Sequence, residues 1–282
     1  MSIRTRFAPS PTGRLHLGHA LAARVAHDLA RSEPDGRFLL RFEDIDATRV
    51  REDFYQETET DLRWLGLTWD ETPLRQTDRS DAYQAALDTL RLAGLVYPCF
   101  CTRKEIQAEV ARMVSAPHGP EGPNYPGTCR NLTPDEAATR TSAGHAHAWR
   151  LDSHKASLQT GPLTFTDLRH GTIAADPDLL GDVILARKDI GCAYHLAVVV
   201  DDAFQHITHV TRGEDLLPSS HVHRLLQVLL GFPEPLYLHH HLILDSEGKR
   251  LAKRGESLSI HALREAGVSP EEVLEMIAPE GA

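Results

Sequence analysis

Residues 6–19 read Arg-Phe-Ala-Pro-Ser-Pro-Thr-Gly-Arg-Leu-His-Leu-Gly-His, the most informative stretch of the chain. Its first residues have the character of the end of a buried strand, residues 10–13 form a tight turn, and a helix follows. Along that helix Leu21, Val25 and Leu29 recur at helical spacing and are expected to face the core. The stretch therefore predicts a strand, a turn and a helix in immediate succession.

The start of that helix is a candidate phosphate site. A helix N-terminus concentrates unpaired N–H groups and the positive end of the macrodipole, so it attracts phosphate. His16 and His19 are three residues apart and hence neighbours on the first turn, while Gly18 leaves room for a nucleotide beside the backbone. The same pattern also fits a plain connection with two surface histidines, because short motifs match by chance.

Composition places the chain among ordinary globular proteins. Its 282 residues are 41% hydrophobic and 25% charged, enough for one large domain and a smaller one. No apolar run reaches the length of a membrane span and the first residues lack a signal-peptide core, so a cytoplasmic address without a membrane partner is expected. Four cysteines argue against a disulfide framework. The net charge of −10 predicts weak non-specific binding to nucleic acid, which a local basic footprint would still permit.

The next segments extend the pattern toward a parallel sheet. Residues 38–42 form an apolar strand after a turn at residues 33–36, which gives a strand-helix-strand unit with ligands at the carboxyl ends of its strands. Glu43 stands at that end, in the acidic run Glu-Asp-Ile-Asp. Acidic residues in this position form either a solvated loop or a grip for an amine.

Three cysteines in the middle of the chain have the spacing of a metal site. Cys99 and Cys101 form a Cys-x-Cys pair, and a loop rich in proline and glycine leads to Cys129. Thiolates suit tetrahedral zinc, which needs a fourth ligand, and the loop offers His118 or Tyr125. The alternative is three free thiols without a metal.

The second half of the chain returns to strand signals. Residues 194–200 are an apolar run that predicts a buried parallel strand ending in Asp-Asp, and residues 207–211 predict another strand, followed by Arg212. Consecutive histidines at residues 239–241 point to opposite faces of a strand, so they do not converge on one ion. The basic cluster at residues 249–254 is, by its pattern alone, a solvated loop.

Together these motifs resemble the signatures of class I aminoacyl-tRNA synthetases of the glutamate branch. Residues 6–19 resemble the first signature, and Lys-Arg-Leu-Ala-Lys-Arg at residues 249–254 resembles the second, from which Arg250 and Ala252 depart. The resemblance implies that His16, His19 and Lys253 stabilise the phosphates of ATP as charge builds in the transition state. The other positions of the ATP site and the two signatures are Gly18, Pro9, Ser10, Pro11, Thr12, Gly13, Arg250, Leu251, Ala252 and Arg254.

The resemblance also implies a glutamate pocket. Glu43 matches the residue that contacts the α-ammonium group, and Arg6 and Arg212 match two guanidiniums that hold the side-chain carboxylate. A glutamine amide could not compensate for the burial of those charges, so the pocket is expected to prefer glutamate. Val198 stands where full-length members often have asparagine, so one polar contact is expected to be missing. The other pocket residues carried over are Ala8, Ser10 and Tyr194.

In the shortened paralogue of the glutamyl synthetases, the cysteine cluster is Cys-x-Cys with Tyr-x-x-x-Cys, a pattern that this sequence reproduces. The resemblance thus makes the four residues ligands of one structural zinc ion, which would staple an insertion too poor in apolar residues for its own core. The insertion is expected where synthetases hold the end of the nucleic acid. The implied ligands are Cys99, Cys101, Tyr125 and Cys129.

The expected fold class is α/β, a Rossmann-type parallel-sheet catalytic domain of class I aminoacyl-tRNA synthetases with an inserted zinc-stapled subdomain. Nothing in the sequence resembles the helical anticodon-reading domain of complete glutamyl synthetases. The expected parts are residues 1–96 for the first Rossmann half, 97–180 for the inserted acceptor-like subdomain, 181–246 for the second half, and 247–282 for the signature loop and C-terminal helices.

The implied activity is ATP-dependent, tRNA-independent activation of L-glutamate to glutamyl-adenylate, with Mg²⁺. The cysteine cluster and the lack of an anticodon domain resemble the glutamyl-queuosine tRNA(Asp) synthetase family, whose members transfer glutamate to the queuosine wobble base of tRNA(Asp). The expected partners are therefore ATP, L-glutamate and that tRNA, with the protein acting as a monomer. Three alternatives stay open: a truncated glutamyl-tRNA synthetase acting on a tRNA 3′ end, a small-molecule nucleotidyltransferase, and a non-catalytic RNA-binding relative.

Overall fold

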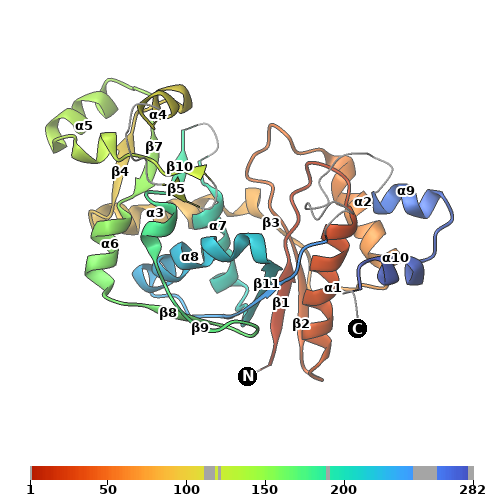
Figure 1. The fold of residues 1–282 in the computed structure, drawn as a ribbon. Helices are drawn as coiled ribbons and strands as arrows, with labels where there is room; N and C mark the ends of the chain where they lie inside the picture. The colour runs from red at the N-terminus through yellow and green to blue at the C-terminus, as the bar shows by residue number, and fades with distance from the viewer. Residues whose placement is uncertain (1, 111–117, 120–121, 189–190, 244–258, 279–282) are drawn as a thin grey trace.

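The computed structural model describes residues 2–110, 118–119, 122–188, 191–243 and 259–278. A three-stranded parallel sheet, a four-stranded sheet of mostly parallel strands and a three-stranded antiparallel sheet form its framework (Figure 1). The α/β class expected from the sequence is confirmed. The elements of the first third are β1 (Arg4–Phe7), α1 (Leu17–Arg31), β2 (Arg37–Phe42), α2 (Glu52–Trp64), β3 (Leu74–Arg75) and α3 (Ser80–Leu92).

The first sheet has the order β1-β2-β3, with all of its strands parallel. The strand-helix-strand prediction for the N-terminal residues is therefore confirmed. The expectation that Leu21, Val25 and Leu29 face the core holds fully only for Leu21, since the other two are half-buried. Alanines give the helix a narrow buried face that lets it lie close to the sheet: Ala20, Ala23, Ala26 and Ala30 are fully covered.

The second sheet has the order β11-β12-β8-β9, in which only the β8–β9 pair is antiparallel. Strand β1 lies beside β11 in Figure 1, and the Thr208 N–H donates to the Arg4 carbonyl at 3.0 Å. The carboxyl ends of β1, β2, β11 and β12 therefore face a common edge, where ligands bind in open parallel sheets. The elements of this part are β11 (His209–Gly213), α8 (Leu217–Leu230), β12 (Leu236–His240), β8 (Thr164–Asp167) and β9 (Gly171–Ala174).

The antiparallel sheet, of order β10-β7-β4, carries the middle of the chain. Figure 1 shows it at the upper left with α4 and α5, away from β1 and β2. Residues 97–180 contribute strands to three sheets, because β8 and β9 of that range join β12, and β5 and β6 pair only with each other among the described residues. The elements are β4 (Val96–Cys99), α4 (Arg103–Val110), β5 (His118–Gly119), β6 (Gly122–Pro123), α5 (Pro134–Ser142), β7 (Ala148–Leu151), α6 (Ser153–Thr160) and β10 (Ile184–Arg187).

The prediction of a strand at residues 194–200 is wrong, because this run lies in helix α7 (Tyr194–Phe204). An apolar run of this length does not distinguish a buried strand from a buried helix, since neither leaves a polar face. Here residues 196–202 are all buried, and α7 packs between α3, α8 and β10. Val198 belongs to that apolar core.

The C-terminal helices α9 (Ile260–Glu265) and α10 (Pro270–Met276) pack near the first sheet, beside α1 and α2 (Figure 1). Ser269 and Glu272 form the capping box at the start of α10 that their spacing predicts, and each side chain satisfies an N–H of the other residue. Within the described ranges, no helix combines the length and the apolar character that a bilayer crossing requires.

Candidate active site

A cleft of about 490 Å³ opens at the common edge of the first and second sheets. Five separate segments build it, namely the β1–α1 turn, the end of β2, the start of α7, the end of β11 and the end of β12. Every predicted ATP and glutamate residue that the structure describes lines this one cleft. They are Arg6, Ala8, Ser10, His16, Gly18, His19, Glu43, Tyr194 and Arg212, and Pro9 of the first signature lies among them.

The two signature histidines close the N-terminus of α1. His16 is the N-cap, so it precedes the helix and does not belong to its first turn as expected. Its Nδ1 accepts the Gly18 N–H at 3.1 Å, and His19 Nδ1 accepts the His16 N–H at 3.2 Å. The ring centroids are 3.9 Å apart. A Cβ at Gly18 would lie 3.0 Å from the His16 ring, so glycine keeps this pair in place.

The second signature lies outside the described residues, including Arg250, Leu251, Ala252, Lys253 and Arg254. The described residues on both sides of it reach the cleft. Leu242 and Ile243 line the cleft, whereas Ser259 forms a β-bridge with His16, and the Ile260 N–H donates to the Leu15 carbonyl at 2.8 Å. The residues before the second signature therefore line the cleft, and the residues after it lie beside the first signature.

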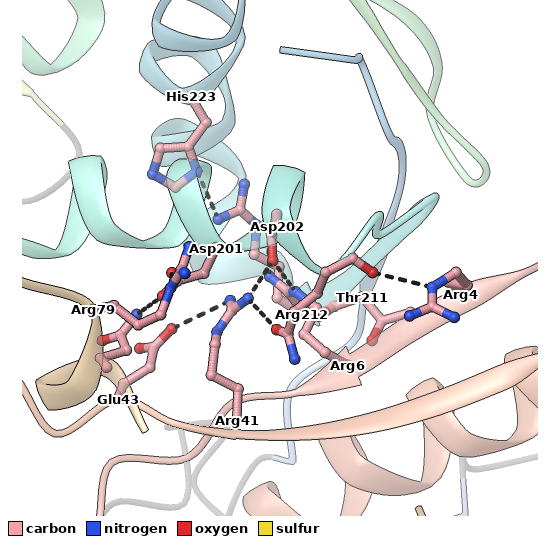
Figure 2. Close-up of polar contacts among 12 residues, drawn as sticks. Arg4, Arg6, Arg41, Glu43, Arg79, Asp201, Asp202, Thr211, Arg212 and His223 are labelled. Carbon is pink, nitrogen blue, oxygen red and sulfur yellow. Dashed lines mark hydrogen bonds and ion pairs between the residues drawn. The ribbon is translucent and has the colours of Figure 1, made fainter. Parts of the chain in front are cut away.

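Arg6 lies beneath the cleft in a network of buried charges (Figure 2). Its Nε donates to Asp202 Oδ1 at 2.8 Å, and its Nη1 donates to the Thr211 carbonyl at 3.1 Å. The same Asp202 oxygen accepts Arg41 Nη1 at 2.8 Å. Burial alone would raise the pKa of Asp202, but Arg6 and Arg41 together lower it, so this carboxyl stays ionised.

Glu43 faces the cleft beside this network. Its Oε1 lies 3.8 Å from Arg41 Nη2, too far for a hydrogen bond. Burial raises the pKa of Glu43 to about 7, against the opposing effect of Arg41 and Arg6. An ammonium group bound in the cleft would favour the ionised form of this carboxylate.

Arg212 enters from the other side of the cleft, where its Nη1 donates to the Tyr194 hydroxyl at 3.3 Å. The cleft therefore presents two guanidiniums, those of Arg6 and Arg212, and the carboxylate of Glu43. Each of these groups has different neighbours. A molecule with a positive group and a carboxylate would find partners for both.

Several residues that organise the cleft escaped prediction. Arg41 is fully covered although it sits inside an apolar strand, and a charge in such a strand was a readable signal. Asp202 was visible only as the end of an apolar run. His223 gave no signal and His239 was noted only as part of a histidine run, because the partners of both lie in other segments of the chain.

The predicted metal residues also come together. The sulfur atoms of Cys99, Cys101 and Cys129 lie within 4.8 Å of one another, and the Cys101–Cys129 separation is 3.5 Å. Tyr125 Oη lies 3.6 Å from Cys101 Sγ and accepts the Cys129 N–H at 2.8 Å. Sulfur ligands of tetrahedral zinc are roughly 3.8 Å apart, so the donor set fits that ion. His118, the alternative fourth ligand, stands in β5.

Comparison with known proteins gives close matches over nearly the whole chain. The family model described as tRNA synthetases class I (E and Q), catalytic domain, matches residues 2–282. The chain is 48% identical to the glutamyl-Q tRNA(Asp) synthetase of Rhodobacter capsulatus, covering 97% of this chain and 99% of that protein. It is 44% identical to the protein of the same name from Symbiobacterium thermophilum, with 97% and 84% covered.

Longer proteins match as well. The glutamate–tRNA ligase of Aquifex aeolicus is 40% identical over 95% of this chain, which spans 55% of that protein. A crystal structure of a glutamate tRNA ligase from Elizabethkingia meningosepticum, in complex with its amino acid, superposes with a TM-score of 0.75 at 30% identity. That match covers 90% of this chain and 52% of the other, so the chain spans about half of the solved structure.

Proposed function

The chain belongs to the class I tRNA synthetases of the glutamate and glutamine family, and from this membership we propose that it activates L-glutamate with ATP and transfers it to tRNA. It is a ligase of the aminoacyl-tRNA type. The observation that carries the proposal is the single cleft at the sheet edge, which gathers the phosphate-binding and amino-acid-binding candidates from four of its five segments.

Glutamate binds with its α-ammonium group on Glu43 and its side-chain carboxylate between Arg6 and Arg212. The guanidiniums are suited to this role because a planar fork pairs with a carboxylate through parallel hydrogen bonds. Glutamine would leave a buried guanidinium charge without a counter-charge, so it binds poorly. Ala8, Ser10 and Tyr194, which line the same cleft, form the walls of the pocket.

ATP binds at the N-terminus of α1, with its phosphates against His16, His19 and Lys253 and its nucleoside beside Gly18. The glutamate α-carboxylate attacks the α-phosphorus in line, and pyrophosphate leaves. Here the protein mainly positions the reactants and stabilises charge on the phosphate oxygens. Mg²⁺ accompanies ATP and neutralises part of the triphosphate charge.

The acceptor is the queuosine wobble base of tRNA(Asp). This assignment is supported by the names of relatives that match along most of their length, including the protein from Rhodobacter capsulatus. The alternative acceptor is a tRNA 3′ end. The observation that supports it is the match to glutamate–tRNA ligases such as that of Aquifex aeolicus. A second hollow of about 530 Å³ shares Ser10, Glu43 and Tyr194 with the cleft and continues past Arg150 and Arg187, so the site extends toward the antiparallel sheet, where either acceptor could enter.

One zinc ion held by Cys99, Cys101, Tyr125 and Cys129 staples the inserted subdomain. The four donors fit a closed tetrahedral site, which serves structure because no position stays open for a reacting molecule. The ion would link β4 to the turn at residues 128–131, which already packs against it through Cys99, Tyr125 and Cys129.

The activation step is tested by glutamate-dependent exchange between ATP and pyrophosphate in the absence of tRNA. Glutamate is expected to support exchange and glutamine is not. Lys253→Ala should reduce exchange by about 100-fold or more, whereas Lys104→Ala, on the exposed surface of α4, should leave it unchanged. Normal exchange by Lys253→Ala would show that the second signature has been misplaced, and no exchange by the wild type would refute the proposal.

The acceptor is tested with radiolabelled glutamate and two preparations of tRNA(Asp), with and without queuosine. Transfer that requires the modified base supports the assignment. Equal labelling of both preparations, lost when the 3′ terminal nucleoside is removed, would favour the alternative acceptor.

A further inference from the structure

Among the described residues, the side chains that hydrogen-bond to the guanidinium of Arg212 are uncharged. Its Nε donates to His239 Nε2 at 3.3 Å, and its Nη2 donates to Ser220 Oγ at 2.5 Å. Its Nη1 lies 3.2 Å from His223 Nδ1 and 3.3 Å from Tyr194 Oη. Among the residues that the structure places, no carboxylate forms an ion pair with Arg212, so nothing in its surroundings cancels its charge.

Arg6 differs in this respect, although it lines the same cleft. Asp202 accepts its Nε at 2.8 Å and approaches its Nη2 at 3.4 Å, so Arg6 carries a counter-charge before any ligand arrives. Of the two guanidiniums predicted to hold a carboxylate, Arg212 therefore keeps the greater part of its attraction for a ligand.

A buried carboxylate fixes the orientation of the histidine beside Arg212. Asp167, whose side chain is fully covered, approaches His239 Nδ1 with Oδ2 at 2.7 Å. Burial would raise the pKa of Asp167, but hydrogen bonds from His239, His170 and two backbone N–H groups lower it to about 2. The carboxylate must accept, so the proton of His239 is on Nδ1 and its Nε2 lone pair faces Arg212.

The second histidine is oriented in the same manner. His223 Nδ1 accepts from Arg212, so its proton is on Nε2, which lies 3.1 Å from His195 Nδ1. Burial, helped by the charge of Arg212, lowers the pKa of His223 well below its usual value, and that of His239 to about 4. Both rings are neutral at physiological pH and accept from the guanidinium without neutralising it.

We propose that Asp167, His239 and His223 are positioning residues that aim Arg212 into the cleft while preserving its positive charge for the carboxylate of the substrate. An imidazole placed between Asp167 and Arg212 transmits the orienting effect of the carboxylate but prevents direct ion pairing, much as histidines between carboxylates and metals fix ligand geometry. This inference rests on the proposed function, and it assigns discrimination between glutamate and glutamine to the imidazoles behind Arg212.

The test compares two substitutions at His239 in the exchange reaction. His239→Phe keeps a ring against Tyr237, which stacks on the native imidazole with centroids 5.8 Å apart, but it removes the acceptor. The KM for glutamate is expected to rise by about 30- to 100-fold, with kcat at saturating glutamate changed by less than about threefold. The preference for glutamate over glutamine should fall by a similar factor.

His239→Gln restores an oxygen acceptor and should return the KM for glutamate to within about fivefold of the wild-type value. Ser220→Ala removes the acceptor of Nη2 without enlarging a side chain, and it gives a second measurement if His239→Phe fails to fold. It should raise the same KM by about fivefold.

An unchanged KM and an unchanged amino-acid preference in folded His239→Phe, or in Ser220→Ala, would overturn the inference. Equal impairment of the phenylalanine and glutamine variants would overturn it too, since the acceptor would then be irrelevant. If the wild type supports no exchange with glutamate, the proposed function fails instead, so the two failures are distinguishable.

Discussion

Two buried polar clusters in this molecule are held together in opposite ways. The charged floor of the cleft, formed by Arg6, Arg41 and Asp202, joins residues 161 and 196 positions apart through full ion pairs. The cysteine cluster joins Cys101 to residues 24 and 28 positions away, through weak contacts between thiols and a phenol. Protein carboxylates alone pair the charges of the floor, although Arg41 Nε and Nη2 form no hydrogen bond, whereas the cysteine cluster brings together donors that could hold a metal ion.

This difference shows two kinds of preorganisation in one chain, namely pairing of charges within the protein and gathering of donors around a site for an ion. Charges of opposite sign fix the floor of the cleft before a ligand arrives, which limits the reorganisation that binding requires. The cysteines gather a local segment whose rigidity would depend on an added ion if the proposed zinc site is correct. Damage to the floor should therefore affect the whole fold, and damage to the cysteine cluster should stay local.

The largest expected effect follows from Asp202→Asn. This change leaves the buried guanidiniums of Arg6 and Arg41 without their shared counter-charge, so the free energy of unfolding should fall by about 3 to 5 kcal/mol. Urea denaturation of the purified variant measures it. Asp28→Asn is the matched control, because it breaks an exposed pair with Arg24 and should cost less than about 1 kcal/mol. Similar losses from both variants would contradict the claim that the floor supports the fold.

A smaller effect is expected in the pH dependence of glutamate binding, which the proposal assigns to Glu43. The pKa of Glu43 is about 7, so its carboxyl is mostly neutral at pH 6 and mostly ionised at pH 8. If the ionised form binds the substrate ammonium, the affinity for glutamate should rise roughly tenfold across this range. Calorimetric titration with glutamate, without ATP, measures it. Glu43→Gln should bind weakly with no such slope, and a persistent slope would assign the titration to another group.

The smallest effect on catalysis is expected from the cysteine cluster. Cys129→Ser should lower the zinc content and the hydrogen-exchange protection of β4 and residues 128–131, while tRNA-independent exchange of ATP and pyrophosphate changes by less than about twofold. Elemental analysis and amide exchange follow the two regions separately. Cys192→Ala, in the apolar core around α7, should leave the zinc content unchanged. Loss of zinc together with loss of activation would show that the two regions are not independent.

The sequence predicted the parts of the fold that depend on local pattern. The turn at residues 10–13, the strand before it, the helix after it and the capping box at Ser269 were recognisable because the patterns that indicate them lie within a few residues. Which residues line the cleft was also predictable where the residue belongs to a recognisable motif, as for Glu43 and Tyr194. Their roles remain proposals.

The remaining features depend on contacts between distant segments. The apolar run starting at Tyr194 does not indicate whether it will pack against strands or helices. In the structure it packs against α3 and α8 and is itself a helix. The partners of Arg212 come from three further elements, so no spacing rule could have indicated that His223 and His239 surround it. The apolar strand around Arg41 indicated that this charge is buried, but its counter-charge could not be identified because it lies 161 residues away.

The bridge between Ser259 and His16 has a consequence for biosynthesis. A ribosome releases the β1–α1 turn early, but the segment that pairs with it emerges only after more than nine-tenths of the 282 residues have been translated. Strand β1 likewise waits for Thr208 before its neighbour β11 exists. The nascent polypeptide therefore exposes an unpaired sheet edge for most of its synthesis. During this period it is a substrate for chaperones and cannot yet bind nucleotides in a complete cleft.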